Sequence, residues 1–342
     1  MKGRESKQYS IVMVGAGRMG KNHLRAMARS KIFNLVAVID PEKPPLEAEM
    51  LQSAAYLRSL EELFAAPVVY DCALVAATTG VHFEIAQVFL KKRVHLLMEK
   101  PLASTCLQSE EIVRLAKSNN LVLATAHVER FNPAIRELQA VLEKHLIGEI
   151  VSLQSFRGGL APQTIGHGND VVLDMAVHDI DIISMLVGPL SLQNVKCRSI
   201  DSSGTFHHAD IFFHGKNGVP AIVSASWLSP IRHRTLRITG TEGVALVDFL
   251  NRKTLVYKRK MSSGAQAISG EADCIEGKDV LRDSGLEPIQ DALEAQLKDF
   301  EQLLLQSEGA MSLKFLRTIC LGEEGAQAVR LVEEARMLGR KS

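Results

Sequence analysis

The residues of this chain best suited to chemistry include a lysine at the end of an apolar run. Lys100 lies in Glu99-Lys100-Pro101, directly after residues 94–98. Apolar runs of this kind form parallel strands whose carboxyl ends border the ligand crevice. Pro101 favours an extended Lys100, which directs its amine away from the strand. Lys100 could therefore hydrogen-bond a reacting oxygen; the alternative is a solvated lysine that begins a loop.

A second set combines a histidine with carboxylates. Asp174 and His178 are four residues apart, so on a helix they share a face, and Asp181 extends the same stripe. An imidazole oriented by a carboxylate can accept a proton near neutral pH. The alternative is the solvated side of an amphipathic helix. We expect no metal here, because no further histidine has ligand spacing.

The apolar residues 11–14 run into a G-x-G-x-x-G motif at Gly15, Gly17 and Gly20, and Asp40 ends the next apolar run. These glycines permit a tight turn, close approach of a pyrophosphate, and packing of helix on strand. The following helix directs its free N–H groups at the phosphates. Asp40 can accept both hydroxyls of an adenosine ribose. The pattern predicts a dinucleotide-binding domain.

Asp40 also favours NAD over NADP. A 2′-phosphate within about 4 Å of this carboxylate would cost about 1 to 4 kcal/mol. Pro41 and Glu42 follow, and Lys43 is the nearest cation that could offset this repulsion.

The first part of the chain alternates near-continuous apolar runs with helical stretches. This pattern predicts a parallel sheet covered on both faces, that is, a doubly wound α/β Rossmann domain over residues 1–125. The expected strands are 11–14, 35–39, 70–77, 94–98 and 121–125, and the expected helices are 24–30, 59–65, 81–92 and one that Ser104 opens as N-cap and that ends near 119.

Residues 126–342 have a different pattern, with short alternating runs separated by close turns. We expect an α+β domain with a largely antiparallel open sheet for substrate binding and oligomerisation. The expected strands are 150–157, 193–200, 207–214, 219–227, 234–240, 244–249 and 254–258, the expected helices are 172–186, 288–306 and 312–337, and 261–284 is expected to be a mobile loop. The last helices could pack on either domain.

The composition excludes several classes of protein. The chain has 342 residues, of which 46% are hydrophobic, enough for two cores. Its 40 basic and 39 acidic side chains give a net charge of +1, so we expect no nucleic-acid or membrane partner. The five dispersed cysteines suit reduced thiols in the cytoplasm.

Taken together and in this order, the motifs resemble the glucose–fructose oxidoreductase and inositol dehydrogenase family (Gfo/Idh/MocA). The resemblance implies an NAD(P)-dependent sugar or polyol oxidoreductase that forms homo-oligomers through its open sheet. It implies the catalytic set Lys100, Asp174 and His178. The residues expected to bind the cofactor are Gly15, Gly17, Arg18, Met19, Gly20, Asp40, Thr78, His82, Glu99 and Lys100. Thr79 stands where the family often has proline.

Residues 126–133, Ala-His-Val-Glu-Arg-Phe-Asn-Pro, resemble a stretch of the dehydrogenases that oxidise the 3-hydroxyl of UDP-N-acetylhexosamines. Arg130, Arg157 and His167 could then contact a diphosphate, although each could equally form a structural salt bridge. The alternatives are a dehydrogenase of free polyols, inositol or aldoses, and a non-catalytic NAD sensor. A biliverdin-reductase-like enzyme is disfavoured by Lys100 and His178.

Overall fold

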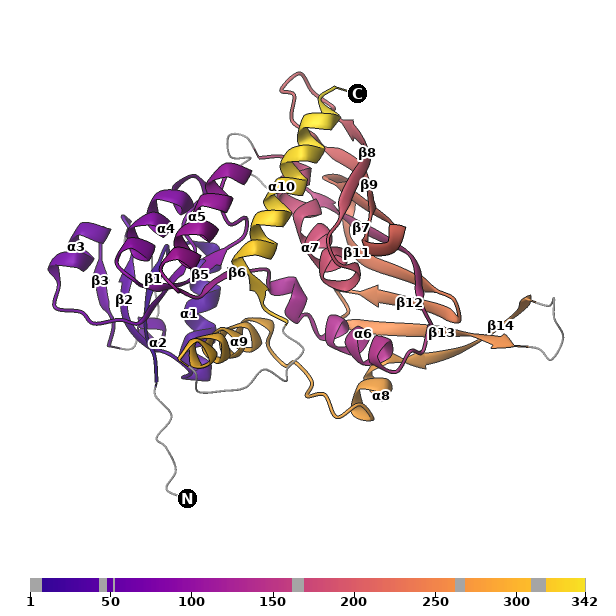
Figure 1. The fold of residues 1–342 in the computed structure, drawn as a ribbon, viewed down its shortest axis with the longest axis horizontal. Helices are drawn as coiled ribbons and strands as arrows, with labels where there is room; N and C mark the ends of the chain where they lie inside the picture. Colours follow the sequence, from indigo (N-terminus) through magenta and orange to yellow (C-terminus); the bar gives the residue numbers. More distant parts are fainter. Residues whose placement is uncertain are drawn as a thin grey trace. The chain divides into compact units, whose positions relative to one another are not determined.

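The computed structural model describes residues 8–42, 48–51, 53–161, 169–261, 268–308 and 318–341. The chain divides into two compact units (Figure 1). The first unit contains residues 1–128 and 291–329, and the second contains 129–290 and 330–342. The division at 128 lies close to the expected boundary. The segment 291–329 falls in the range expected for the second domain, whose last helices were expected on either domain, and it groups with the first unit.

The first unit is built on a seven-stranded sheet in the order β15-β6-β5-β4-β1-β2-β3, in which all pairs are parallel except β15 with β6. Its strands are β1 (Ser10–Val14), β2 (Asn34–Ile39), β3 (Ala55–Leu57), β4 (Cys72–Val75), β5 (His95–Glu99), β6 (Leu123–Ala126) and β15 (Cys320–Leu321). The chain crosses from β3 to β4, on the far side of β1, and this reversal makes the sheet doubly wound.

Helices pack on both faces of this sheet. Consecutive residues of a strand point to opposite faces, so an apolar strand presents apolar side chains to helices on each side. Val12 and Val14 belong to a buried cluster with Phe89 of α4, whereas Met13 points to Gly20 of α1. The helices are α1 (Arg18–Ser30), α2 (Ala48–Leu51), α3 (Leu60–Ala65), the 3-10 turn η1 (Thr79–Val81), α4 (His82–Lys91), α5 (Cys106–Ser118) and α9 (Ala292–Ser307). α9 contacts α1, and its Phe300 packs against Phe33, which follows that helix.

The second unit is built on an eight-stranded sheet in the order β14-β13-β12-β11-β7-β10-β9-β8, antiparallel except for β7 with β10. Its strands are β7 (Ile150–Leu160), β8 (Ser191–Arg198), β9 (His208–His214), β10 (Pro220–Ser226), β11 (Leu228–Gly240), β12 (Gly243–Asp248), β13 (Lys253–Met261) and β14 (Ile268–Glu276). The fold class expected from the sequence, a parallel Rossmann sheet followed by a largely antiparallel one, is confirmed.

Helices cover one side of this second sheet. The 3-10 turn η2 (Val128–Phe131) leads into α6 (Pro133–Glu143), and Figure 1 shows α6 beside β12 and β13, which it contacts. The π-helical turn η3 (Val172–Ala176) continues as α7 (Val177–Val187), which contacts β7 and β10. The remaining elements are the turn η4 (Lys216–Gly218), α8 (Gly277–Arg282) and α10 (Gly322–Gly339), whose last residues belong to this unit.

Three expectations about local structure were wrong. Residues 261–284 are not one loop, because β14 pairs with β13 and α8 follows directly. The last helix does not span 312–337: residues 309–317 lie outside the described part, Cys320 and Leu321 form β15, and α10 starts at Gly322. The N-cap of α5 is Thr105, whose hydroxyl accepts the N–H of Gln108, and not Ser104.

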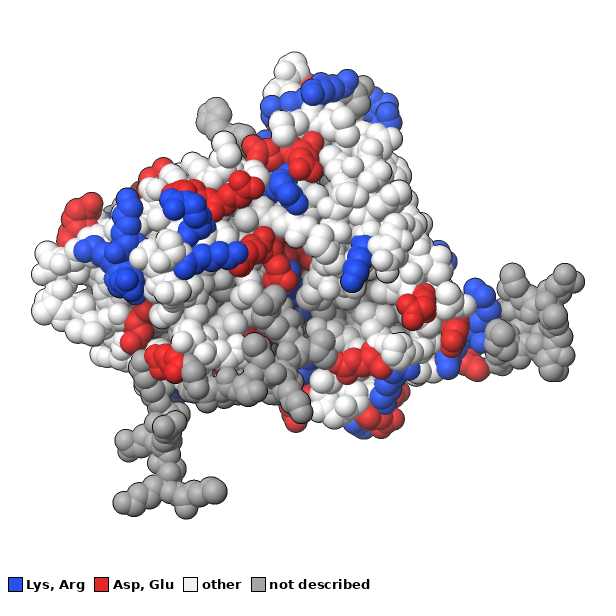
Figure 2. All heavy atoms as spheres, viewed as in Figure 1, with Lys and Arg blue, Asp and Glu red and all other residues white. Residues whose placement is uncertain are grey.

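Charges of both signs lie beside one another on the face seen in Figure 2, in keeping with a net charge of +1. Among the described residues, no helix combines the length and the apolar composition needed to span a bilayer.

Candidate functional site

The glycine-rich turn of the first unit connects β1 to α1. Gly15 has φ +89°, and a Cβ there would lie 2.5 Å from the backbone N of Ala77. A Cβ on Gly20 would lie 2.1 Å from the carbonyl oxygen of Gly15, so only glycine lets the helix approach the strand. A Cβ on Gly17 would meet no atom within 4 Å. Gly17 therefore borders open space, as a residue against a ligand must.

The first turn of α1 suits an anion. It contains no acidic residue, and its N-cap, Gly17, provides no side chain to occupy the free N–H groups. Arg18 is exposed and Met19 is partly exposed at the same end. The N–H groups and the positive end of the helix dipole are therefore available to phosphate.

Asp40, directly after β2, is tied to this turn. Its Oδ2 accepts the N–H of Ala16 at 2.7 Å, and its Oδ1 accepts the N–H of Glu42 at 3.0 Å. Each carboxylate oxygen keeps a second lone pair, so these bonds still leave acceptors for ribose hydroxyls. Lys43 lies outside the described residues.

The carboxyl end of β5 presents Lys100 at the same edge of the sheet as the turn after β1. Glu99 is 6% exposed and accepts two hydrogen bonds, from His23 Nε2 at 2.7 Å and from the backbone N–H of Lys100 at 3.1 Å. The peptide bond from Lys100 to Pro101 is cis. Lys100 itself is partly exposed.

His82 is 1% exposed, with both ring nitrogens facing backbone carbonyls. Nδ1 lies 3.0 Å from the carbonyl oxygen of Pro101, and Nε2 lies 3.1 Å from that of Ala77. His82 and Glu99 were expected to contact the cofactor. Both are buried and bound to protein groups, and their contact with the cofactor stays a prediction, whereas Thr78 is exposed.

In the second unit, Asp174 and His178 lie on consecutive turns of one continuous helical segment. Asp174 belongs to the π-helical turn η3 and His178 to the first turn of α7. Both are partly exposed. Asp174 Oδ2 accepts the indole N–H of Trp227 at 3.1 Å, a partner that the sequence did not indicate. π-helical turns occur frequently at functional sites.

The start of this segment is held by another carboxylate that the sequence analysis missed. Asp170, 3% exposed, accepts the N–H groups of Val172 and Leu173 through Oδ1, each at 3.1 Å. Its Oδ2 accepts Arg336 Nε at 2.7 Å. Asp170 therefore caps the segment and anchors it to the end of α10.

Two of the three residues expected to contact a diphosphate are in buried ion pairs. Arg130, 2% exposed, donates to Asp181 through Nε at 2.8 Å and Nη2 at 2.7 Å. Arg157, 1% exposed, donates to Asp179 through Nε at 2.9 Å and Nη2 at 3.1 Å. Both arginines therefore form the structural salt bridges that were the alternative to substrate binding. Guanidinium groups paired in this way argue against a contact with the diphosphate. His167 lies outside the described residues.

Glu129 extends the second pair into a network. It accepts Arg157 Nη1 at 3.1 Å and Arg234 Nη1 at 3.2 Å. Burial lowers the pKa of Arg157, but the carboxylates of Asp179 and Glu129 outweigh it, so the pKa rises and the charge is retained. Burial, aided by the charge of Arg157, lowers the pKa of Arg234. The stretch 126–133, taken from the sequence as a mark of substrate class, thus includes the structural charges of Glu129 and Arg130.

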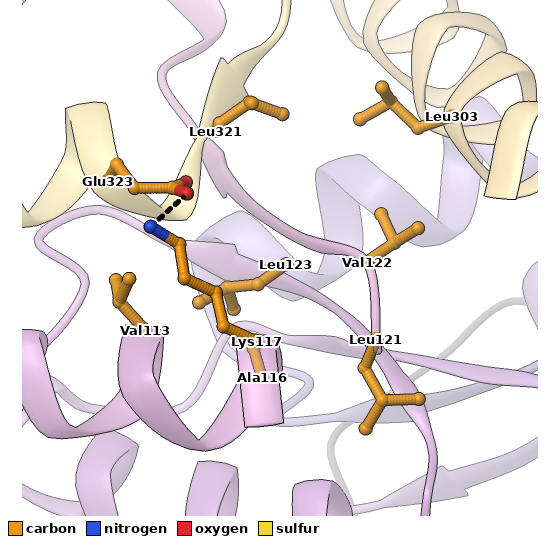
Figure 3. A pocket seen from close by; sticks show the side chains of 9 residues that line it. All are labelled: Val113, Ala116, Lys117, Leu121, Val122, Leu123, Leu303, Leu321 and Glu323. Atoms are coloured by element: carbon orange, nitrogen blue, oxygen red, sulfur yellow. Dashed lines mark ion pairs between the residues drawn. The ribbon is translucent and has the colours of Figure 1, made fainter. Parts of the chain in front are cut away.

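A separate pocket in the first unit contains none of the expected site residues (Figure 3). It lies beside β6 and β15, and Lys117 and Glu323 form an ion pair there at 2.9 Å. The other lining residues are all apolar: Val113, Ala116, Leu121, Val122, Leu123, Leu303 and Leu321.

Comparison with known proteins matches both units to one family. Residues 9–127 match the GFO/IDH/MocA oxidoreductase family with its NAD-binding Rossmann fold, and residues 135–246 match the GFO/IDH/MocA C-terminal domain. The UDP-N-acetylglucosamine 3-dehydrogenase of Acidithiobacillus ferrooxidans is 30% identical over 298 residues, which cover 84% of this chain and 86% of that protein.

Other relatives have different substrates. The inositol 2-dehydrogenase of Rhizobium meliloti is 24% identical over 69% of this chain and 74% of its own length. A levoglucosan dehydrogenase solved with NADH and L-sorbose superimposes with a TM-score of 0.78 at 19% identity, over 98% of this chain and 97% of its own, and shows the shared fold.

The structural role of Arg130 predicts a loss of stability from Arg130→Met. This variant leaves Asp181 buried without its cation, and we expect the free energy of unfolding in urea to fall by about 3 to 5 kcal/mol. Arg130→Met with Asp181→Leu should recover most of the loss, because no charge then stays buried. Arg114→Met, which removes an exposed pair with Glu111, should change little. If Arg130→Met instead unfolds at the same free energy as wild type and has a raised KM for a UDP-sugar, Arg130 binds the substrate.

Proposed function

This chain belongs to the Gfo/Idh/MocA family of oxidoreductases, and on that premise we propose that it is an NAD-dependent dehydrogenase of UDP-N-acetylhexosamines. The reaction is hydride transfer between the sugar C3 and the nicotinamide, which interconverts a hydroxyl and a ketone. The observation that carries the substrate class is the 30% identity to a UDP-N-acetylglucosamine 3-dehydrogenase over 84% of this chain.

The residues of the first unit fit NAD. The open space at Gly17 and the acid-free first turn of α1 suit the pyrophosphate, and Asp40 retains lone pairs for the ribose. When bound, NAD supplies the hydride acceptor. The charge of Asp40 disfavours a 2′-phosphate, which is the basis for proposing NAD rather than NADP.

In this proposal Lys100, Asp174 and His178 act on one substrate hydroxyl. His178 accepts its proton during oxidation, and Asp174, held by Trp227, orients the imidazole. Lys100 donates a hydrogen bond to the reacting oxygen and stabilises the negative charge that develops on it. Lys100 as the base is the alternative within the same set. His167 is retained as a proposed contact of the diphosphate.

Free inositol is the second candidate substrate, favoured by the 24% identity to an inositol 2-dehydrogenase. It requires the same catalytic set. A sensor without catalysis would bind NAD and turn over neither class of sugar. The substrate panel below therefore separates all three functions.

We predict that purified protein with NAD produces NADH, followed at 340 nm, on UDP-N-acetylglucosamine and much more slowly on myo-inositol or glucose. Lys100→Ala and His178→Ala should each lower kcat by about 10²- to 10⁴-fold, because a proton-transfer or oxygen-stabilising group is lost. Their dissociation constants for NAD should stay near the wild-type value. Lys91→Ala and His214→Ala, which change exposed residues, serve as controls. Full activity in either catalytic variant would remove that residue from the mechanism.

Cofactor preference tests the role of Asp40. We expect kcat/KM to be at least about 10-fold higher with NAD than with NADP, since about 1.4 kcal/mol of repulsion gives that factor. Asp40→Ser removes the charge and should lower this ratio about 10-fold. Glu42→Ser changes the neighbouring exposed carboxylate and should leave the ratio unaltered. An unchanged ratio in Asp40→Ser would show that other residues select the cofactor.

We also propose that a second copy of the chain covers the outer face of the eight-stranded sheet. Leu246 is 38% exposed and pairs with Leu255 across β12 and β13. An apolar sheet face gains stability when it is buried.

Sedimentation equilibrium should find a dimer or tetramer that Leu246→Asp dissociates. The aspartate would place a charge in the buried interface. Leu107→Asp, at a residue 79% exposed in the first unit, is the control and should sediment like wild type. A monomeric wild-type protein would contradict the proposal.

A further inference from the structure

Two buried histidines are hydrogen-bonded to the residues on either side of Lys100, His23 to the Glu99 carboxylate and His82 to the Pro101 carbonyl, and take no part in the proposed chemistry. His23 lies on α1 and is 0% exposed; His82 begins α4 and is 1% exposed. Both belong to the first unit, and each is hydrogen-bonded to residues adjacent to Lys100. A buried imidazole with a specific partner serves either general packing or the placement of that partner.

His23 acts on Lys100 through Glu99. A carboxylate as buried as Glu99 requires donors on both oxygens, and it has them: His23 Nε2 at Oε1 and the N–H of Lys100 at Oε2. His23 Nδ1 is buried and finds no hydrogen-bond partner among the described residues. The tautomer that suits this environment carries its proton on Nε2, because it donates to Glu99 and leaves only an acceptor unpaired.

His82 holds the chain on the other side of Lys100. Its Nδ1 lies 3.0 Å from the carbonyl oxygen of Pro101, and its Nε2 lies 3.1 Å from that of Ala77, just after β4. In the tautomer with its proton on Nδ1, His82 donates to the Pro101 carbonyl, so the backbone is fixed at the N–H of Lys100 and again at the carbonyl of the next residue. A long, flexible side chain reaches a reacting atom reproducibly only if the backbone that carries it is fixed.

We propose that His23, through Glu99, is a positioning residue for Lys100, and that His82 is its counterpart on the following residue. This inference rests on the proposed function, in which Lys100 touches the reacting oxygen. A displacement of about 1 Å at a reacting group can lower a rate by about 100-fold, so the two histidines affect turnover without touching substrate.

The test compares three variants of the intact protein. His23→Phe keeps an aromatic ring but removes the donor to Glu99, and His23→Gln restores a side-chain N–H. His95→Phe is the matched control: His95 lies at the start of β5, where its Nδ1 accepts the N–H of Val122 at 2.9 Å. It removes a histidine hydrogen bond from the same strand at the end remote from Lys100.

The first measurement needs no substrate. Hydrogen–deuterium exchange at single-residue resolution follows the amide of Lys100, and Pro101 contributes no amide of its own. We expect His23→Phe to accelerate this exchange about 10-fold or more, with the other amides of β5 unchanged. His23→Gln should restore most of the protection, and His95→Phe should retain all of it.

The second measurement is turnover. His23→Phe should lower kcat about 10- to 100-fold, with KM and the dissociation constant for NAD within about threefold of wild type. His23→Gln should recover most of kcat, and His95→Phe should lower the melting temperature without lowering kcat. This split separates positioning from a general loss of structure.

The proposal is overturned if His23→Phe leaves both the exchange of Lys100 and kcat unchanged. It is also overturned if exchange accelerates throughout the first unit and kcat falls only with the folded fraction. If wild type turns over no sugar while His23→Phe still exposes the Lys100 amide, the proposed function fails and the positioning of Lys100 stands.

Discussion

The constraint on which both units depend is the high free energy of a buried, unpaired charge. Four carboxylates are almost fully buried beside the segments that carry the candidate catalytic residues: Glu99, Asp170, Asp179 and Asp181. Each carboxylate accepts hydrogen bonds from donors. Glu99 has a histidine and a backbone N–H, and each of the three aspartates has an arginine. Removing one partner of a buried ion pair costs about 3 to 5 kcal/mol. These donors therefore fix the segments that carry Lys100, Asp174 and His178.

The architecture was predictable where each element has its own local signal. Continuous apolar runs indicated the parallel strands β1, β2, β4, β5 and β6 but not the short β3, and the spacing of Gly15, Gly17 and Gly20 indicated the turn that the structure contains. The failures have a shared cause. β14 carries glycine, serine and acids, and it is a strand because β13 provides its backbone partners. The two-residue strand β15 likewise depends on β6, from which it is separated by almost 200 residues.

The sequence indicated which types of residue the candidate site contains, but it indicated less well what each residue does. Arg130 and Arg157 looked like anion-binding residues because a sequence does not reveal which carboxylates face them across a fold. Trp227 and Arg336 contact Asp174 and Asp170 from distant parts of the sequence, so no spacing identifies these pairs, whereas an aspartate two residues before Val172 was a readable capping signal. The sequence did contain a signal for His23. It lies three residues after Gly20 and beside Leu24 on the buried face of α1, and a buried histidine needs a polar partner. Glu99 provides it.

The central claim is that Lys100 and His178, contributed by different units, act on one hydroxyl. A crystal structure of the protein with NADH and UDP-N-acetylglucosamine tests it most directly. We predict that Lys100 Nζ and a ring nitrogen of His178 both lie within hydrogen-bond distance of the sugar O3, with C3 facing the nicotinamide. A bound sugar that leaves either side chain out of reach of the reacting oxygen would contradict the account.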